Sequence, residues 1–268
     1  MKIAQACGIA GVLVVMSGGA TGTELTFLID GLSNFALMPG VYGDRVVMLD
    51  DGVYHYDEHG EGFTPNVEVS YSDSVGQSPA YWQSGYGDLT EVYFEDADGI
   101  GLGEIVLTAD YGYEVVLYGF EMAAYSSAFS SDPTIRSVSV GGCSSVPLFE
   151  VIDPVISETT STAFDFSDQP LQAREIRVMF DSSNLSGLSD DICIDNLRFG
   201  QVAIEVGEIS CPADFAPSIC VLDFLDISAF IGFYNNQEAR GDINGDGEFD
   251  FIDISLFIQS YTAGCDTD

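Results

Sequence analysis

Two runs near the middle of the chain decide the fold, EIVLT from Glu104 and YEVVLYGFEM from Tyr113. Both are rich in β-branched and aromatic residues and alternate in part between apolar and polar side chains, which is typical of half-buried strands. Similar runs flank them on both sides: TELTFLI from Thr23, DRVVML from Asp44, NVEVSY from Asn66, EVYFE from Glu91, IRSVSV from Ile135, PLFEVI from Pro147, REIRVMF from Arg174 and DICIDNLRF from Asp191. Turn clusters separate these runs, and no long periodic helix intervenes. We therefore predict a mainly β fold, an antiparallel, jelly-roll-like sandwich over residues 23–203.

Charge and composition narrow the class of protein. The chain has 268 residues, of which 46% are hydrophobic, which is ample for a packed core. Seven Lys and Arg face 43 Asp and Glu, and the formal net charge is −36. Nucleic acid needs a basic footprint that this charge balance does not supply, so we exclude nucleic acid as a partner. Surface carboxylates also keep a protein soluble in salty surroundings, and we expect some of them to be metal ligands.

The first twenty residues indicate export. Lys2 precedes an apolar run from Ile9 to Met16, and small residues follow that run. This order of charged, apolar and small residues is that of a secretory signal peptide, and we place cleavage after Ala20. No later run approaches the roughly 20 apolar residues that a membrane span needs. We therefore expect a secreted or cell-surface protein without a transmembrane segment after cleavage.

The last fifty or so residues carry an internal repeat. VLDFLDISAFIGFYN from Val221 aligns with EFDFIDISLFIQSYT from Glu248, 27 residues further on. In each copy a loop rich in acids precedes apolar residues at helical spacing, which predicts two loop–helix units. These units form a module over residues 211–265, behind a linker at 204–210.

The second loop predicts a calcium site. Asp242 stands at position 1 of a twelve-residue loop, and Gly247 stands at position 6, where the turn requires a positive φ. Oxygen ligands at alternate positions let one tight turn surround a hard cation. The predicted ligands are Asp242, Asn244, Asp246, Glu248 through its carbonyl, Asp250 and Asp253.

The first loop is degraded. Cys220 replaces the glycine at position 6, and Asp214 reaches position 1 only with a one-residue insertion. We predict a weak or absent calcium site here, with Asp214, Ser218, Asp223 and Asp226 as its candidate ligands.

Two loop–helix repeats at this spacing resemble a dockerin domain. The flanking CPADF from Cys211 and AGC from Ala263 resemble the variant that ends in Gly-Cys on exported bacterial proteins. GFTPNVEVSYSDS from Gly62 and SDDICIDNLRFGQ from Ser189 resemble β-sandwich domains of exported proteins with terminal sorting modules. The resemblance implies a calcium-dependent anchoring or assembly role, with a protein or cell-surface receptor as partner.

The resemblance also implies a pairing of cysteines. It joins Cys211 to Cys265 and Cys143 to Cys193, which leaves Cys220 as the odd thiol. A Cys211–Cys220 bridge is the alternative.

Loop positions 10 and 11 depart from the dockerin pattern. Cellulosomal dockerins present small hydroxyl residues there, whereas this chain has Phe224 and Leu225 in one copy and Phe251 and Ile252 in the other. We expect these pairs either to contact a different receptor or to form a core between the two helices.

One segment of the sandwich suggests carbohydrate binding. SPAYWQSGYGDLTEVYF from Ser78 supplies Tyr81, Trp82 and Tyr86, and exposed aromatic faces stack against sugar rings. The alternative is that these residues pack in the core and at its edge. A further hypothesis places a structural calcium between Asp30, Asp195 and Asn196.

Motifs of catalysis are missing from the sequence. It holds no GxSxG elbow, no HExxH and no phosphate loop, and we expect His55 and His59 to be solvent-exposed. We therefore expect an exported, non-catalytic protein, in which a β-sandwich with a candidate carbohydrate-binding face is joined to a calcium-dependent dockerin-like module for anchoring or assembly. The alternatives are a polysaccharide-acting hydrolase bearing a dockerin and a structural surface-layer component.

Overall fold

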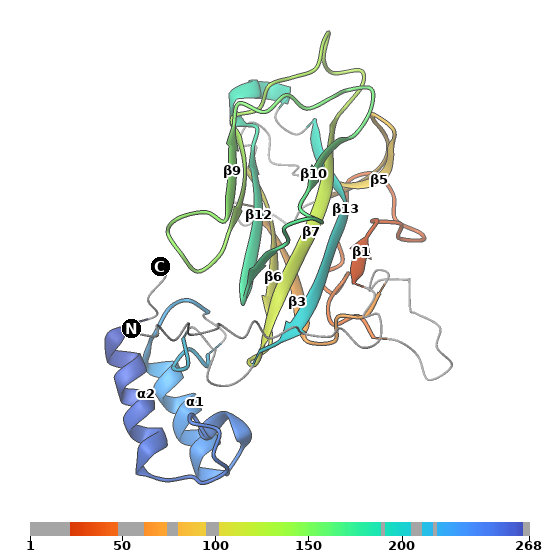
Figure 1. Ribbon diagram of the computed structural model, residues 1–268. Helices are drawn as coiled ribbons and strands as arrows, with labels where there is room; N and C mark the ends of the chain where they lie inside the picture. The colour runs from red at the N-terminus through yellow and green to blue at the C-terminus, as the bar shows by residue number, and fades with distance from the viewer. Residues whose placement is uncertain are drawn as a thin grey trace, which may run out of the picture.

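The computed structural model describes residues 22–47, 62–73, 80–94, 102–188, 191–204, 211–216 and 219–264. Two antiparallel sheets face one another. Two helices come after the last strand in the chain and lie below the sheets in Figure 1. The prediction of a mainly β sandwich followed by a small helical module is confirmed, whereas the finer jelly-roll assignment stays a prediction. The signal peptide, His55 and His59 lie outside the described residues.

The strands and helices follow the chain in a simple order. The strands are β1 Thr23–Leu25, β2 Ala36–Leu37, β3 Val67–Asp73, β4 Ala80–Tyr86, β5 Leu89–Phe94, β6 Leu102–Ala109, β7 Tyr113–Ala124, β8 Ser137–Gly141, β9 Phe149–Ile152, β10 Thr162–Asp165, β11 Leu171–Ala173, β12 Glu175–Asp181 and β13 Ile192–Ala203. The helices are η1 Ser183–Leu188, α1 Phe224–Asn235, η3 Ala239–Gly241 and α2 Phe251–Ala263.

The two sheets differ in size. The eight-stranded sheet has the order β10-β7-β13-β5-β4-β2, with β1 paired to β13 and β11 paired to β7. The five-stranded sheet has the order β3-β6-β12-β8-β9. The long strands β7 and β13 pair antiparallel from Tyr113 and Ala203 to Ala124 and Ile192, and they form the centre of the larger sheet.

The core lies between the sheets and follows the alternation of the strands. On the larger sheet, Val115, Leu117 and Met122 of β7 are fully buried. They belong to one cluster with Leu107 of β6 and Val178 of β12 from the facing sheet. Because alternate residues of a strand point to opposite faces, the residues between them, such as Val116, lie on the outer faces.

Parts of the predicted strands are wrong. TELTFLI forms a strand only over Thr23–Leu25, because Phe27 adopts a left-handed φ of 53° that ends the extended backbone. The amide of Phe27 donates instead to Tyr42 Oη at 2.7 Å. DRVVML forms a turn rather than a strand over its described residues 44–47.

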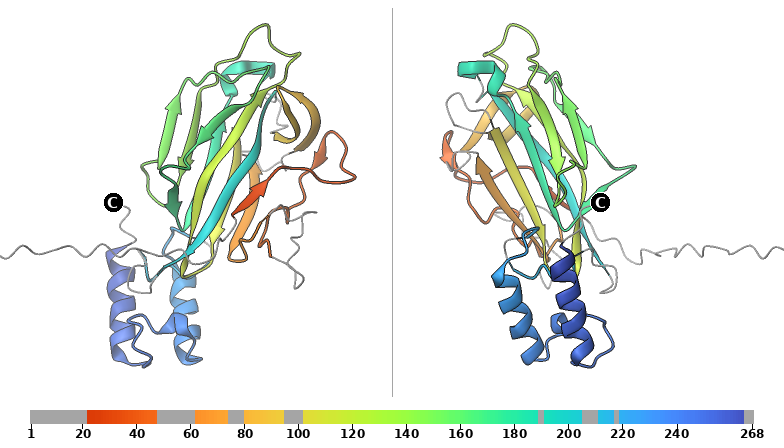
Figure 2. Two further views of the ribbon diagram at one scale, coloured as in Figure 1. Left: turned by 45° about the vertical axis from the view of Figure 1, so that its right-hand side comes forward. Right: turned by 90° about the vertical axis from the view of Figure 1, so that its left-hand side faces the viewer.

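The helical module is built from the predicted repeat. Asp223 caps α1 and Asp250 caps α2, each in a capping box completed by an aspartate three residues later. Phe230 of α1 stacks on Phe257 of α2, with ring centroids 4.1 Å apart. Figure 2 shows α1 and α2 side by side at one end of the sandwich. None of the helices in the described part of the chain is long and apolar enough to cross a membrane.

Candidate functional site

A cleft of about 480 Å³ opens where the five-stranded sheet meets the helical module; we name it the junction cleft. Its floor is the outer face of β3, β6 and β12, to which every second residue of these strands contributes. On β3, for example, Glu68 and Ser70 face the cleft, while Val67 and Val69 are buried in the core. The module supplies one wall, made of Phe215, Ala216, Ile219 and Arg240.

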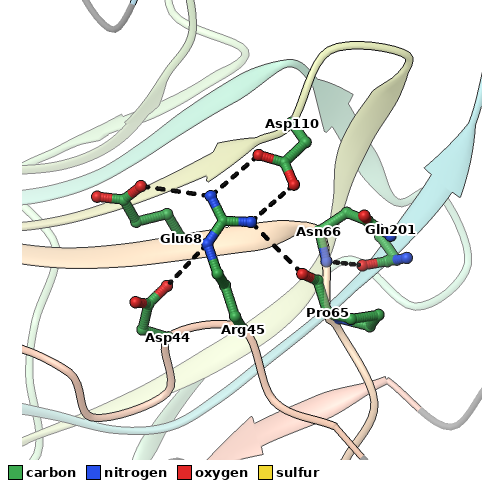
Figure 3. A network of polar contacts seen from close by, with 7 residues as sticks. All are labelled: Asp44, Arg45, Pro65, Asn66, Glu68, Asp110 and Gln201. Atoms are coloured by element: carbon green, nitrogen blue, oxygen red, sulfur yellow. Dashed lines mark hydrogen bonds and ion pairs between the residues drawn. The ribbon is translucent and has the colours of Figure 1, made fainter.

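Four of the six arginines of the chain line the junction cleft. At the end shown in Figure 3, Arg45 makes two hydrogen bonds to the carboxylate of Asp110, at 2.7 and 3.0 Å. Glu68 lies 3.5 Å from the same guanidinium. The hydrogen bond to Asp110 is the largest cause of the raised pKa of Arg45. This pairing fixes a flat polar group at one end of the floor.

A second network fixes the middle of the floor. Arg177 donates through Nε to Glu175 at 2.7 Å and through Nη1 to Glu104 at 3.0 Å. Its pKa is raised, because these hydrogen bonds and charges outweigh the opposing effect of burial. Guanidinium and carboxylate groups held in this way present donors and acceptors in a fixed plane.

A further part of the junction cleft is aromatic, and we name it the aromatic end. The ring of Tyr111, which follows β6, stacks on Phe215 of the module with centroids 4.8 Å apart. The guanidinium groups of Arg174 and Arg240 lie 5.7 and 5.8 Å from the centre of the same tyrosine ring. Arg174 is mostly buried and lies 3.3 Å from the carboxylate of Asp214. This end therefore joins the sandwich to the module.

Besides the acceptor Asp214 Oδ1, two donors at the aromatic end have no hydrogen-bond partner among the described residues. They are Tyr111 Oη and Arg174 Nε, and both are buried. Burial raises the pKa of Tyr111 to about 12, against the effect of the two arginines, so its hydroxyl keeps a proton to donate at neutral pH. Unsatisfied buried polar groups cost about 1–3 kcal/mol each, and a ligand oxygen would remove that cost.

The structure separates the three residues predicted to stack on a sugar. Tyr81 and Tyr86 are 1% and 2% exposed, so neither offers a face to a ligand. Tyr81 and Trp82 are neighbours in β4 and point to opposite faces, because side chains alternate along a strand. Trp82 packs on the outer face of the larger sheet against Phe35 and Phe94. The three residues therefore do not form one platform, and the alternative of core and edge packing describes Tyr81 and Tyr86.

The junction cleft has no recognisable signature in the sequence. Tyr111 lies in a turn and Arg240 in a short helix, and neither belongs to a recognisable motif. The available signal is the small number of arginines in the chain, because most of them lie at this one site.

The second acidic loop has the frame of a cation loop. Asp242 Oδ2 accepts from the amide of Gly247 at 2.7 Å, and Asp242 Oδ1 accepts from that of Asp246 at 3.2 Å. Gly247 has a φ of 83°, as the turn requires. Asp253 is fully buried, and its Oδ1 accepts from the amide of Ile243 at 2.8 Å.

The remaining predicted ligands point less clearly to a metal. Asn244 Oδ1 accepts from the amide of Asp246, and Asp250 caps α2. The side chain of Glu248 is exposed. Among the described residues no three His, Cys, Asp or Glu side chains form a group that could hold a metal ion. The all-oxygen donor set and the loop frame suit calcium, and the predicted site stays a prediction.

The first loop repeats this frame with different residues. Asp214 Oδ2 accepts from the amide of Cys220 at 2.8 Å, as Asp242 does from that of Gly247. Cys220 has a φ of 70°, close to that of the glycine it replaces. Asp226 Oδ1 accepts from the amides of Phe215 and Ala216, at 2.8 and 2.7 Å.

In the first loop, the positive charge beside the carboxylate of Asp214 is the guanidinium of Arg174. Arg174 donates through Nη1 to the backbone carbonyl of Asp214 and lies beside its carboxylate. Burial raises the pKa of Asp214, and the charge of Arg174 opposes that shift. Asp223 and Asp226 accept main-chain hydrogen bonds at the start of α1, and Ser218 lies outside the described residues.

The predicted Cys143–Cys193 disulfide is wrong. Cys143 is bonded to Cys220, which also excludes the alternative Cys211–Cys220 bridge. Cys193 is a buried free thiol on the outer face of β13, where it packs with Val92 rather than facing the other sheet. Cys143 follows β8 of the five-stranded sheet, close to the module. The predicted Cys211–Cys265 bridge ends on a residue outside the described part of the chain.

The apolar pairs at loop positions 10 and 11 do not form a core between the helices. Phe224 and Phe251 are 74% and 77% exposed, and Leu225 and Ile252 are also exposed. The helices pack instead through Phe230 and Phe257. The module therefore presents an exposed apolar pair at the start of each helix.

The structure brings together two of the three residues predicted to hold a structural calcium in the sandwich. Asp195 and Asn196 line a pocket of about 170 Å³, but Asp30 does not. Burial, together with the charges of Glu121, Glu24 and Glu91, raises the pKa of Asp195 to about 8.

Comparisons with known proteins add little. No protein-family model matches the chain, and no curated protein matches it. The chain is distantly similar to the family 32 carbohydrate-binding module of NanJ from C. perfringens in complex with galactose, at 12% identity and a TM-score of 0.28, over 50% of this chain and 93% of that chain. A cyclase from Fischerella sp. TAU gives 12% identity and a TM-score of 0.33, over 69% of this chain and 100% of that chain.

A third solved structure contains two CBM32 modules and the M60 catalytic domain of ZmpB from Clostridium perfringens. It gives 10% identity and a TM-score of 0.26, over 94% of this chain and 24% of that chain. These TM-scores are low, so none of the three structures contributes to the function proposed below.

Proposed function

We propose that this chain is an exported, non-catalytic protein that binds polysaccharide in the junction cleft and attaches through its helical module to a protein or cell-surface receptor. The observation that carries the proposal is the aromatic end of the cleft, where two unsatisfied donors, Tyr111 Oη and Arg174 Nε, lie beside stacked rings. Sugar hydroxyls accept such hydrogen bonds, and sugar rings pack on aromatic faces. The cleft volume falls in the usual range for small-ligand sites.

The acidic residues of the cleft support binding rather than hydrolysis. All four carboxylates that line it lie within ion-pair distance of an arginine: Glu68 and Asp110 beside Arg45, and Glu104 and Glu175 beside Arg177. A glycosidase needs one carboxyl group that stays protonated as a general acid. Each carboxylate of the cleft instead directs an oxygen at a guanidinium.

The helical module supports attachment. Its two exposed apolar pairs, Phe224 with Leu225 and Phe251 with Ile252, recur 27 residues apart. Exposed apolar residues of this kind mark contact surfaces for protein partners. We assign calcium to the second loop, with oxygen ligands from Asp242 to Asp253. Calcium that binds only the folded loop would stabilise the module, by about 4 kcal/mol at a thousand times its dissociation constant.

An extracellular location fits the covalent structure. The Cys143–Cys220 disulfide joins the sandwich to the module, and such bonds persist in oxidising compartments. The predicted signal peptide points to the same compartment.

Binding of the purified chain to a panel of plant and algal polysaccharides tests the proposal. We expect retention on at least one polysaccharide without release of reducing sugar. Tyr111→Ala should abolish retention, whereas Trp82→Ala, on the other sheet, should leave it unchanged. Release of reducing sugar would favour the hydrolase, and calcium-driven self-association without glycan binding would favour the surface-layer component.

A further inference from the structure

Positive charge is concentrated at the aromatic end of the junction cleft. The guanidinium groups of Arg174 and Arg240 share the ring of Tyr111, at 5.7 and 5.8 Å from its centre. Among the described residues Asp214 is the one carboxylate within ion-pair distance of either arginine. Burial lowers the pKa of Arg174, and the charge of Arg240 lowers it as well. Two guanidinium groups therefore share one aromatic ring at this point, in a chain of net charge −36.

Arg240 differs from the other arginines of the chain. The other five each have a carboxylate within 4.0 Å, whereas no carboxylate in the described part of the chain lies that close to Arg240. Its guanidinium lies 5.3 Å from the ring centre of Phe233 and also borders the cleft. Aromatic faces attract the charge but satisfy none of the five N–H donors in the plane of the group.

We propose that the aromatic end of the junction cleft is a subsite for an anionic group of the glycan, a carboxylate or a sulfate ester, bound by Arg240 together with the free donors of Tyr111 and Arg174. The inference rests on the proposed function and names the class of its ligand. A guanidinium binds a carboxylate or sulfate through two parallel hydrogen bonds, which no neutral hydroxyl reproduces.

The net charge of the chain does not prevent this binding. Repulsion between exposed charges is screened beyond about 8 Å at physiological ionic strength, whereas the subsite acts at contact distance. The stacked rings of Tyr111 and Phe215 also shield the site from water, which strengthens a charge-assisted hydrogen bond.

Matched pairs of polysaccharides test the inference. The full chain is titrated with polygalacturonate and its methyl ester, and with a sulfated galactan and its desulfated form, at about 0.15 M salt. We expect the charged member of one pair to bind at least tenfold more tightly, the effect of about one charge-assisted hydrogen bond. The pair that shows the difference distinguishes a carboxylate from a sulfate ligand.

Variants of Arg240 complete the test. Arg240→Gln should remove the preference for the charged form and weaken binding of that form, and Arg240→Lys should restore part of the preference. Arg198→Gln, at an exposed ion pair on β13, is the matched control and should change neither. Thermal melting confirms that each variant folds.

Two results would overturn the inference in different ways. Equal binding of charged and neutral forms, or an unchanged preference in Arg240→Gln, removes the anionic subsite and leaves the proposed function intact. Failure of the parent chain to bind any polysaccharide removes both.

Discussion

Removal of the Cys143–Cys220 disulfide tests how the sandwich and the module depend on one another. The two cysteines are 77 residues apart, so the bond closes a long loop in the unfolded chain. The loop-entropy relation gives a stabilisation of about 4.5 kcal/mol for a loop of this length. With a urea m-value of about 2–3 kcal/mol/M, the midpoint of unfolding should fall by roughly 1.5–2.3 M in the double variant Cys143→Ala, Cys220→Ala.

Two probes separate the parts of the molecule in this experiment. Trp82 is the only tryptophan and reports on the sandwich, whereas far-ultraviolet circular dichroism at the helical band reports on the module. The transitions should coincide in the parent chain and separate in the variant, with the module unfolding first. Cys193→Ala removes a buried free thiol without breaking a cross-link and serves as the control. An unchanged midpoint in the double variant, or the same loss in the control, would refute the reasoning.

Further predictions concern single residues. Burial raises the pKa of Asp195 to about 8, so the unfolded chain loses this proton at a lower pH than the folded chain. The free energy of unfolding should therefore fall as pH rises from about 4 to 8. Melting temperatures across that range should show a smaller decrease in Asp195→Asn. Phe257→Ala should cost about 3–5 kcal/mol of module stability, whereas the exposed Phe251→Ala should cost no more than about 0.5 kcal/mol, as chemical denaturation will show. Calcium should raise the melting temperature of the module in the parent chain but not in Asp242→Ala, and an equal rise in both would contradict the loop assignment.

Much of the fold could be predicted because alternation is a local property. In β7 and β13, apolar residues recur along the strand and face the core, and this alternation is visible in the sequence. The positive φ of Phe27, which ends β1, depends on the hydrogen bond from its amide to Tyr42 and therefore on distant packing. No local pattern predicts such an interruption.

The cysteine pairing could not be predicted for the same reason. Sequence spacing gives no distance between Cys143 and Cys220, and it does not show that Cys193 faces away from the core. The loop frames were predictable, since Asp242 and Gly247 stand at fixed positions of a known pattern. The junction cleft was not, because Tyr111 and Arg240 come together only when the module packs on the sandwich.

Hydrogen–deuterium exchange with a bound oligosaccharide tests the central claim most directly. The account predicts slower exchange in β3, in β6 and in residues 211–216, which border the junction cleft, and no change in β4 around Trp82. Protection confined to β4 and β5, or none at a saturating concentration of a glycan that binds, would contradict it.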